Sequence, residues 1–237
     1  YKDGRPDLAR GWFDRTFQAD TGHEMAALYR ISCRESLGDR DGAFEAYADY
    51  LERWPDNSEI RREYVGALMA ARRFADAAAG IEAGIPYERP GTVDHAALAA
   101  CYRNTGRHRE AGTLYRSLLR ASPDNEEYLL GLALCLEKSG LTSTAVELLE
   151  KGAPFIGKPG PWSALGILHA RKGRAEQALE AFRKAAELGP ADPKPLRNMA
   201  RIYDKTGLPD LARKYKARAS ALEVRAKSPG SLAKPGR

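Results

Sequence analysis

The sequence lacks any long apolar run. Its most apolar stretch, residues 128–136, ends after nine residues at Glu137, whereas a membrane-spanning helix needs about 20. The first residues also lack the pattern of a secretory signal peptide. Charged residues make up 30% of the chain and hydrophobic residues 43%, with a mean hydropathy of −0.53. We therefore expect a protein that buries a core in water and does not insert into a membrane.

The motifs that usually carry catalysis are absent too. The sequence has no G-x-x-x-x-G-K-[ST], G-x-G-x-x-G, H-E-x-x-H or G-x-S-x-G pattern. Its four histidines show no metal-ligand spacing. Two of them, His95 and His169, stand where bulky residues recur, so we expect them to be packed. These absences predict a chain that is not an enzyme and that binds neither a cofactor nor a metal.

Net positive charge is absent from most of the chain. The formal net charge is +6, but residues 213–237 hold eight basic residues and one acid. That segment carries +7, which leaves about −1 for residues 1–212. A neutral body with a basic end is typical of a solvated terminus rather than of a nucleic-acid surface. We expect no nucleic-acid partner.

What the sequence does have is a repeat, marked by seven evenly spaced alanines. They are Ala9, Ala43, Ala77, Ala111, Ala145, Ala178 and Ala212, at steps of 34 residues with one step of 33. A Gly stands five positions before each alanine except Ala77, where Arg72 takes its place. A constant period in this range indicates stacked structural units.

Each unit has the pattern of two amphipathic helices. Apolar residues recur every three to four positions on both sides of the glycine, as they do around Gly173. The glycine permits a tight reversal between the helices, and Ala178 is small because the helices come closest there. Four positions after the alanine stands a large apolar anchor in six of the units. These anchors are Phe13, Tyr47, Ile81, Tyr115, Leu149 and Phe182.

The best unit, residues 159–192, shows a pattern that resembles a known family. Its marker residues are Trp162, Leu165, Gly166, His169, Gly173, Ala178, Phe182, Ala185, Leu188 and Pro190. Their spacing is similar to that of the tetratricopeptide repeat, and the likeness covers residues 1–222. The resemblance implies an all-α fold, a right-handed solenoid of stacked antiparallel helix hairpins. It also implies a protein-binding scaffold, with the first helix of each hairpin on the concave face.

The repeat register predicts one solenoid over residues 1–225 and a disordered tail over residues 226–237. Residues 1–23 match only a second helix, because Tyr1 falls near the end of a missing first helix. The complete repeats span residues 24–57, 58–91, 92–125, 126–158, 159–192 and 193–225, and the last repeat ends in a capping helix.

The three cysteines share one position of the repeat. Cys33, Cys101 and Cys135 each stand ten residues before the alanine of their unit, where other units have Ala, Leu or Ile. We interpret them as packed apolar residues. Unpaired thiols favour a reducing compartment, so we expect a cytoplasmic protein, or a periplasmic one if an upstream signal or anchor is missing. A body rich in Arg and poor in Lys is typical of a bacterial source.

A second motif recurs at twice the period of the repeat. Gly84-Ile85-Pro86-Tyr87 and Gly152-Ala153-Pro154-Phe155 lie 68 residues apart. Because proline disrupts a helix interior, both motifs predict a second helix that is interrupted about one turn early. The favoured explanation is duplication of a two-repeat block. The alternative is a pair of equivalent loops that present an aromatic residue to a partner.

If the resemblance holds, the concave face can be assigned by register. In the middle units it is small or apolar, and in the last complete unit it is basic. The candidate partner-binding residues are Ala96, Ala100, Leu130, Leu134, Ile167, Arg171, Lys194, Arg197, Asn198, Arg201 and Lys205. Four of the basic residues, between Lys194 and Lys205, step by three, four and four positions and so share one helix face.

We predict that this face binds an extended or helical segment of another protein, with carboxylates against the basic residues and apolar side chains over the middle units. The alternative is that the bases merely keep the terminal repeat soluble. Some members of the family clamp a C-terminal carboxylate with bases from three successive repeats. Here Leu130 and Ser163 stand where those bases would be needed, which argues against that clamp.

Two functions remain open at the level of the whole protein. The favoured one is a scaffold that assembles a multiprotein complex. The other is the repeat portion of a longer protein that serves a catalytic domain, for example a glycosyltransferase, or an exopolysaccharide-export or secretion domain outside this chain. The sequence indicates no particular oligomeric state.

Overall fold

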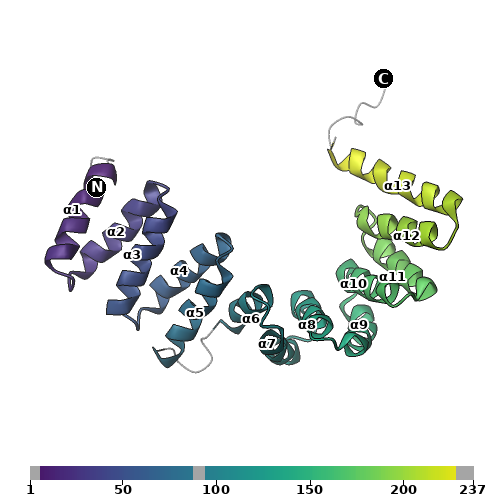
Figure 1. The fold of residues 1–237 in the computed structure, drawn as a ribbon, viewed down its shortest axis with the longest axis horizontal. Coiled ribbons are helices and arrows are strands. Elements are labelled where there is room, and N and C mark those ends of the chain that lie inside the picture. Colours follow the sequence, from purple (N-terminus) through teal and green to yellow (C-terminus); the bar gives the residue numbers. More distant parts are fainter. Residues whose placement is uncertain (1–5, 88–93, 228–237) are drawn as a thin grey trace, which may run out of the picture. The chain divides into compact units, whose positions relative to one another are not determined.

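The computed structural model describes residues 6–87 and 94–227, with side chains from residue 9 onward. Tyr1 and the predicted tail from residue 228 onward lie outside the described residues. The regular structure in the described ranges is helical throughout (Figure 1). The chain divides into two compact units, residues 1–107 and residues 108–237, and each is described by itself.

The N-terminal unit consists of α-helices and one short 3-10 helix in its described residues. Their bounds are α1 Pro6–Ala19, α2 Glu24–Ser36, α3 Arg40–Arg53, α4 Ser58–Ala70, α5 Phe74–Gly84, η1 Ile85–Tyr87 and α6 His95–Asn104. Asp39, Asn57 and Asp94 each accept a hydrogen bond from the first turn of the helix that follows, at the position typical of a helix start.

The C-terminal unit continues the same alternation of first and second helices. Its helices are α7 His108–Ala121, α8 Glu126–Lys138, α9 Thr142–Ile156, α10 Pro159–Arg171, α11 Ala175–Leu188, α12 Lys194–Lys205 and α13 Pro209–Lys227. The last helix extends to residues 226 and 227, at the start of the range predicted to be a tail. The division into one solenoid domain and a disordered tail stays a prediction.

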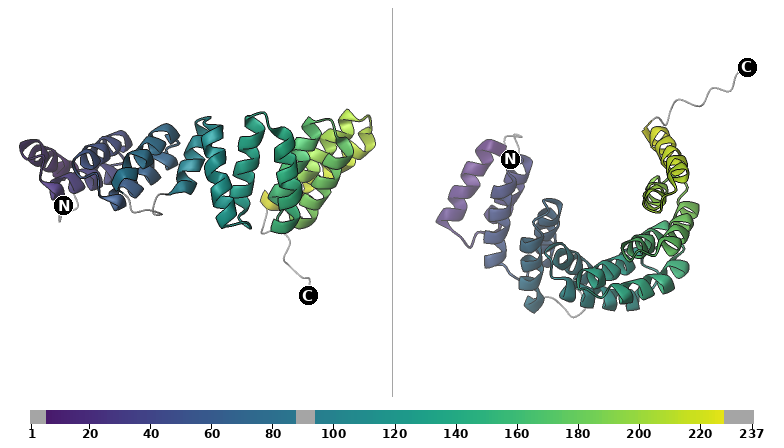
Figure 2. Two further views of the ribbon diagram at one scale, coloured as in Figure 1. Left: turned by 90° about the horizontal axis from the view of Figure 1, so that it is seen from below. Right: turned by 45° about the vertical axis from the view of Figure 1, so that its right-hand side comes forward.

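Within each unit, helices that follow one another in sequence pack against each other, and α8 also contacts α10. Figures 1 and 2 show these hairpins side by side in both units. A chain of hairpins in which each packs on its neighbours is a solenoid, because no single hairpin can bury its own apolar side. The predicted all-α solenoid is therefore confirmed. No helix in the described ranges is both long and apolar enough to cross a bilayer.

The alanines of the repeat mark the tightest helix contacts. Ala77, Ala111, Ala145 and Ala178 are 0% exposed. In the last repeats, Ala178 belongs to one apolar cluster with the anchor Phe182 and with Met199 of α12. A methyl group at this position lets the two helices approach closely, which the sequence pattern correctly predicts.

The turn inside each hairpin needs a left-handed residue. Gly38, Gly106, Gly140, Gly173 and Gly207 all have φ between +71° and +83°. At the turn between α4 and α5, Arg72 adopts φ +60° instead. A non-glycine residue pays about 1–2 kcal/mol for this conformation, so Arg72 holds local strain that the other turns avoid.

We predict that Arg72→Gly stabilises the protein by roughly 1 kcal/mol, since the strain relieved exceeds the added entropy of an unfolded glycine. The free energy of unfolding, from urea titration followed by circular dichroism, measures the effect. Arg72→Ala is the control, because it removes the side chain and keeps the strain. A glycine variant no more stable than the alanine variant would contradict the argument.

The packing around Gly84 and Gly152 explains why a glycine recurs at twice the repeat period. Sequence reasoning missed this explanation. A Cβ atom at Gly84 would lie 2.5 Å from Cδ of Arg61, and one at Gly152 would lie 2.7 Å from Cδ2 of Leu129. Arg61 and Leu129 occupy the same position of their repeats, 68 residues apart. Each glycine therefore makes room for a large side chain of its own hairpin, while Tyr87 and Phe155 of the same two motifs are 52% and 67% exposed. The duplication explanation and the paired-loop explanation both stay predictions.

The predicted interruption of the second helix is right in one case and wrong in the other. α5 ends at Gly84 and a 3-10 turn follows. In contrast, α9 continues through Pro154 to Ile156 and ends at Gly157, which has φ +66°. Pro154 lies within the last turn of α9, so its ring and missing N–H disturb only the end of the ladder.

Charged residues tie the first three helices together. Nε of Arg30 on α2 lies 2.9 Å from Asp14 on α1, and Nη1 lies 3.1 Å from Asp49 on α3. Arg34 lies 3.2 Å from Asp14. The Arg30 side chain is only 11% exposed and stacks over the Phe17 ring. Burial by itself would raise the pKa of Asp14, but hydrogen bonds and charge from Arg30 and Arg34 lower it below its usual value.

We expect Asp14→Asn to destabilise the protein at pH 7 by about 1–2 kcal/mol, because half-buried Arg30 and Arg34 lose a charged partner. A carboxylate with a lowered folded pKa contributes stability above its unfolded pKa and loses it as the pH falls through the folded value. The difference between variant and wild type in urea midpoint should therefore shrink on acidification. A difference that stays constant to pH 3 would contradict this.

The alanine contacts give a third stability test. Ala178→Leu should destabilise by roughly 1–3 kcal/mol through overpacking, whereas the exposed change Glu176→Gln should cost less than about 0.5 kcal/mol. Thermal unfolding of both variants measures this. Equal melting temperatures would mean that Ala178 is not at a close helix contact.

Candidate functional site

A large crevice opens in the C-terminal unit between the α10–α11 hairpin and α12. Its volume is about 960 Å³. The apolar side chains of its lining belong to Ile167, Ala170, Phe182 and Ile202. The polar side chains belong to Arg171, Asn198, Arg201, Asp204, Lys205 and Thr206. We call this site the large crevice. Its lining combines an apolar surface with three bases.

The amphipathic pattern of α12 places the bases at the large crevice. Residues that face the neighbouring helices are buried: Leu196, Met199, Ile202 and Tyr203. Between them, Lys194, Arg197, Arg201 and Lys205 are exposed. The predicted basic face is therefore the solvent side of this helix.

The structure brings five of the predicted partner-binding residues together. Ile167, Arg171, Asn198, Arg201 and Lys205 all line the large crevice.

The other six predicted residues lie outside the large crevice. Lys194 and Arg197 are on the exposed side of α12 and do not line it. Leu130 and Leu134 are on α8 of the same unit, which contacts α10, and Leu134 is 38% exposed. Ala96 and Ala100 belong to α6 of the other unit, and both are half-buried.

Internal acids neutralise part of the basic face. Arg171 pairs with Glu137 of α8, and Arg197 pairs with Glu223 of α13. Arg201 and Lys205 form no ion pair with any residue of the described ranges. The unneutralised charge of the large crevice is therefore at Arg201 and Lys205, with Asp204 as the one acid of the lining.

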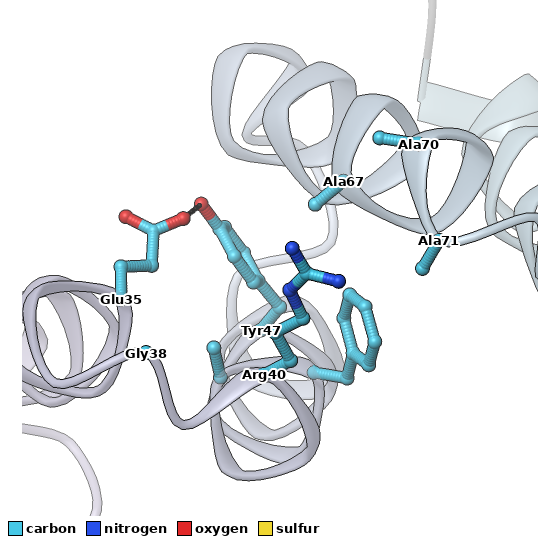
Figure 3. A pocket seen from close by; sticks show the side chains of 9 residues that line it. Glu35, Gly38, Arg40, Tyr47, Ala67, Ala70 and Ala71 are labelled. Atoms are coloured by element: carbon cyan, nitrogen blue, oxygen red, sulfur yellow. Dashed lines mark hydrogen bonds between the residues drawn. The ribbon is translucent and has the colours of Figure 1, made fainter.

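A smaller crevice occupies the equivalent place in the N-terminal unit. Its volume is about 370 Å³, and its lining includes Glu35, Arg40, Tyr47, Ala67 and Ala70 (Figure 3). The Tyr47 hydroxyl donates a hydrogen bond of 2.8 Å to Glu35. Burial, together with the Glu35 carboxylate, raises the pKa of Tyr47 and keeps the phenol protonated. We call this site the small crevice.

Both crevices were missed by sequence reasoning. They depend on which side chains meet across a hairpin, which the register of a single helix face does not reveal. The sequence nevertheless held a sign of the difference between the crevices. Ala170 and Phe182 stand at the positions that Glu35 and Tyr47 occupy in the repeat at residues 24–57.

The reactive side chains give no catalytic arrangement in the described ranges. Cys33, Cys101 and Cys135 form no disulfide among the described residues and are buried, as their register predicts. Burial raises the pKa of the Cys33 and Cys101 thiols, which keeps them protonated. No group of three or more His, Cys, Asp or Glu in residues 6–87 and 94–227 is placed to hold a metal ion.

The two histidines predicted to be packed behave differently. His169 is 4% exposed, and burial lowers its pKa although Glu150 lies 3.7 Å away. His95 is exposed, so that prediction is wrong. It begins α6 directly after Asp94, the residue that caps the helix, and no preceding turn of α6 covers its ring.

Models of one family match the chain in three places. Tetratricopeptide repeat models match residues 36–101, 93–135 and 159–192. The chain belongs to the tetratricopeptide repeat family. The matched segments contain the α10–α11 hairpin of the large crevice and every lining residue of the small crevice except Glu35.

Two curated proteins are similar over part of their length. Protein O-mannosyl-transferase TMTC1 of Homo sapiens is 32% identical over 114 residues, which are 46% of this chain and 13% of that protein. Protein CTR9 homolog of Arabidopsis thaliana is 27% identical over 207 residues, 81% of this chain and 19% of that protein. The chain thus spans less than a fifth of the length of either relative.

Solved structures of other repeat proteins share the fold. MamA, residues 41 to the end, from Desulfovibrio magneticus RS-1 aligns with a TM-score of 0.60 at 17% identity, covering 73% of this chain and 97% of that one. YrrB, described as a TPR protein with an unusual peptide-binding site, aligns with a TM-score of 0.52 at 18% identity, covering 78% and 100%. At these identities the likeness shows the fold alone.

Proposed function

We propose that this chain is a protein-interaction scaffold and that its large crevice binds an acidic segment of a partner protein. The family supports an interaction role in general. The observation that carries the specific proposal is the pair Arg201 and Lys205, which line a partly apolar crevice and form no ion pair with any described residue, Asp204 included.

The proposal explains an unfavourable arrangement on α12. Like charges four positions apart on a helix destabilise it by a few tenths of a kcal/mol, and Arg201 and Lys205 have this spacing. The neighbouring bases Arg171, in the large crevice, and Arg197, outside it, already pair with Glu137 and Glu223. A carboxylate from a partner would neutralise the remaining two and gain strength from the low-dielectric crevice beside them.

A charge reversal tests the proposal against the alternative that the bases only confer solubility. The double variant Arg201→Glu/Lys205→Glu should weaken binding of a labelled glutamate-rich nonapeptide by at least about tenfold at low salt, as measured by fluorescence anisotropy. Added salt should weaken wild-type binding as well.

The matched control is Lys214→Glu/Arg218→Glu, which makes the same charge change on exposed residues of α13 in the same repeat. If the control weakens binding as much as the crevice variant, overall charge and not the large crevice attracts the peptide. Equal binding by all three proteins would also contradict the proposal.

A second candidate concerns the whole protein. The curated relatives are five or more times longer than the region that matches, and the first of them is named as a mannosyl-transferase. This favours a repeat portion that brings partners or substrates to a catalytic or secretion domain elsewhere in a longer polypeptide. The length of the complete open reading frame tests it. An open reading frame that encodes no further domain beside this chain would contradict it.

A further inference from the structure

We infer that the large crevice selects acidic segments that carry one bulky apolar side chain, which enters the crevice while flanking carboxylates meet Arg201 and Lys205. This inference deepens the proposed function and rests on it. Its occupant is a partner segment with acidic, apolar and acidic residues in that order.

The first argument is the comparison of the two crevices within one chain. Seven lining positions correspond, each 135 residues apart, and they include the turn glycines Gly38 and Gly173. The backbone framework is therefore the same repeat element twice. The volumes nevertheless differ, at about 370 Å³ and about 960 Å³, and the large crevice extends further along α10 and α12, over Ile167, Arg171, Asn198, Arg201 and Asp204.

The second argument is chemical. In the small crevice, the Tyr47–Glu35 hydrogen bond joins α3 to α2 across one wall (Figure 3). At the same positions of the large crevice stand Phe182 and Ala170, which have no hydroxyl and no carboxylate. The wall there is apolar, with Ala170 exposed to solvent and Phe182 almost completely buried. An apolar side chain placed against it leaves no polar group of these two residues without a partner.

The third argument is that the apolar wall is held in place. Phe182 is 1% exposed, and a Cβ atom at Gly166 would lie 2.7 Å from its ring. The ring thus packs directly on the α10 backbone. On the opposite side, Ile202 is 7% exposed within the cluster that joins α11, α12 and α13. A preformed apolar site of this kind does not need ordering on binding, which favours affinity.

The position of the bases then specifies the rest of the segment. Arg201 and Lys205 are one helical turn apart on α12 and line the same crevice as the apolar wall. A partner residue that enters the crevice therefore has both bases within reach of its sequence neighbours. A segment with charge alone would leave the apolar wall exposed to water, and a purely apolar segment would leave both bases unpaired.

The test uses two synthetic nonapeptides with the full chain. One has four glutamates on each side of a central leucine, and the other has serine at the centre. Wild-type protein should bind the leucine peptide about tenfold more tightly than the serine peptide, since burial of a leucine side chain favours it. Equal affinity for the two peptides would overturn the inference and leave the proposed function intact.

A matched variant gives the large crevice side chains like those of Glu35 and Tyr47 in the small crevice. Ala170→Gln/Phe182→Tyr places a neutral amide and a phenol where the second repeat has Glu35 and Tyr47, so it fills the crevice without adding charge. It should abolish the preference for the leucine peptide over the serine peptide. A preserved preference in the folded variant, checked by circular dichroism, would overturn the inference.

The peptide measurements distinguish failure of the proposed function from failure of the inference. If neither peptide binds wild-type protein at low salt, the proposed function fails and the inference fails with it. If both peptides bind equally and Arg201→Glu/Lys205→Glu abolishes binding, only the inference fails. The leucine-to-serine comparison needs no variant, so poor folding of the matched variant would not obscure the result.

Discussion

The structure depends on the close contact between the two helices of each hairpin. A left-handed residue reverses the chain, and five positions later an alanine allows the helices to meet. Ala145 and Ala178 are 0% exposed at this contact, where any larger side chain would force the helices apart. The same contact repeated every 34 residues sets the spacing of the stack. The crevices follow from it, because each opens between a reversal and the first helix of the next repeat.

Much of the fold could be predicted because the repeat applies one constraint many times. The alanine register and the buried cysteines were predicted correctly, and so were the turn glycines. Errors occurred where a residue's environment depended on a distant side chain or on its place within a helix. Pro154 was expected to interrupt α9, yet it lies so near the helix end that little hydrogen bonding is lost. Gly84 and Gly152 were explained by duplication of a two-repeat block or by paired loops, and their role in accommodating Arg61 and Leu129 was not predicted.

The site could be predicted only in part for the same reason. The basic face of α12 follows from helix periodicity, so Arg201 and Lys205 were found in the sequence. Which bases remain unneutralised depends on ion pairs between helices, such as Arg197 with Glu223, and periodicity within one helix cannot show these. The size of the large crevice depends on Ala170 and Phe182 together, and their meaning becomes clear only beside Glu35 and Tyr47.

The central claim about function is that a partner segment lies between the α10–α11 reversal and α12. Hydrogen–deuterium exchange with and without the glutamate-rich leucine peptide tests this directly. The account predicts slower exchange confined mainly to residues 167–175 and 198–206 when the peptide is bound. Binding that slows exchange along α13 instead, or in the N-terminal unit, would show that the peptide lies elsewhere and would contradict the account.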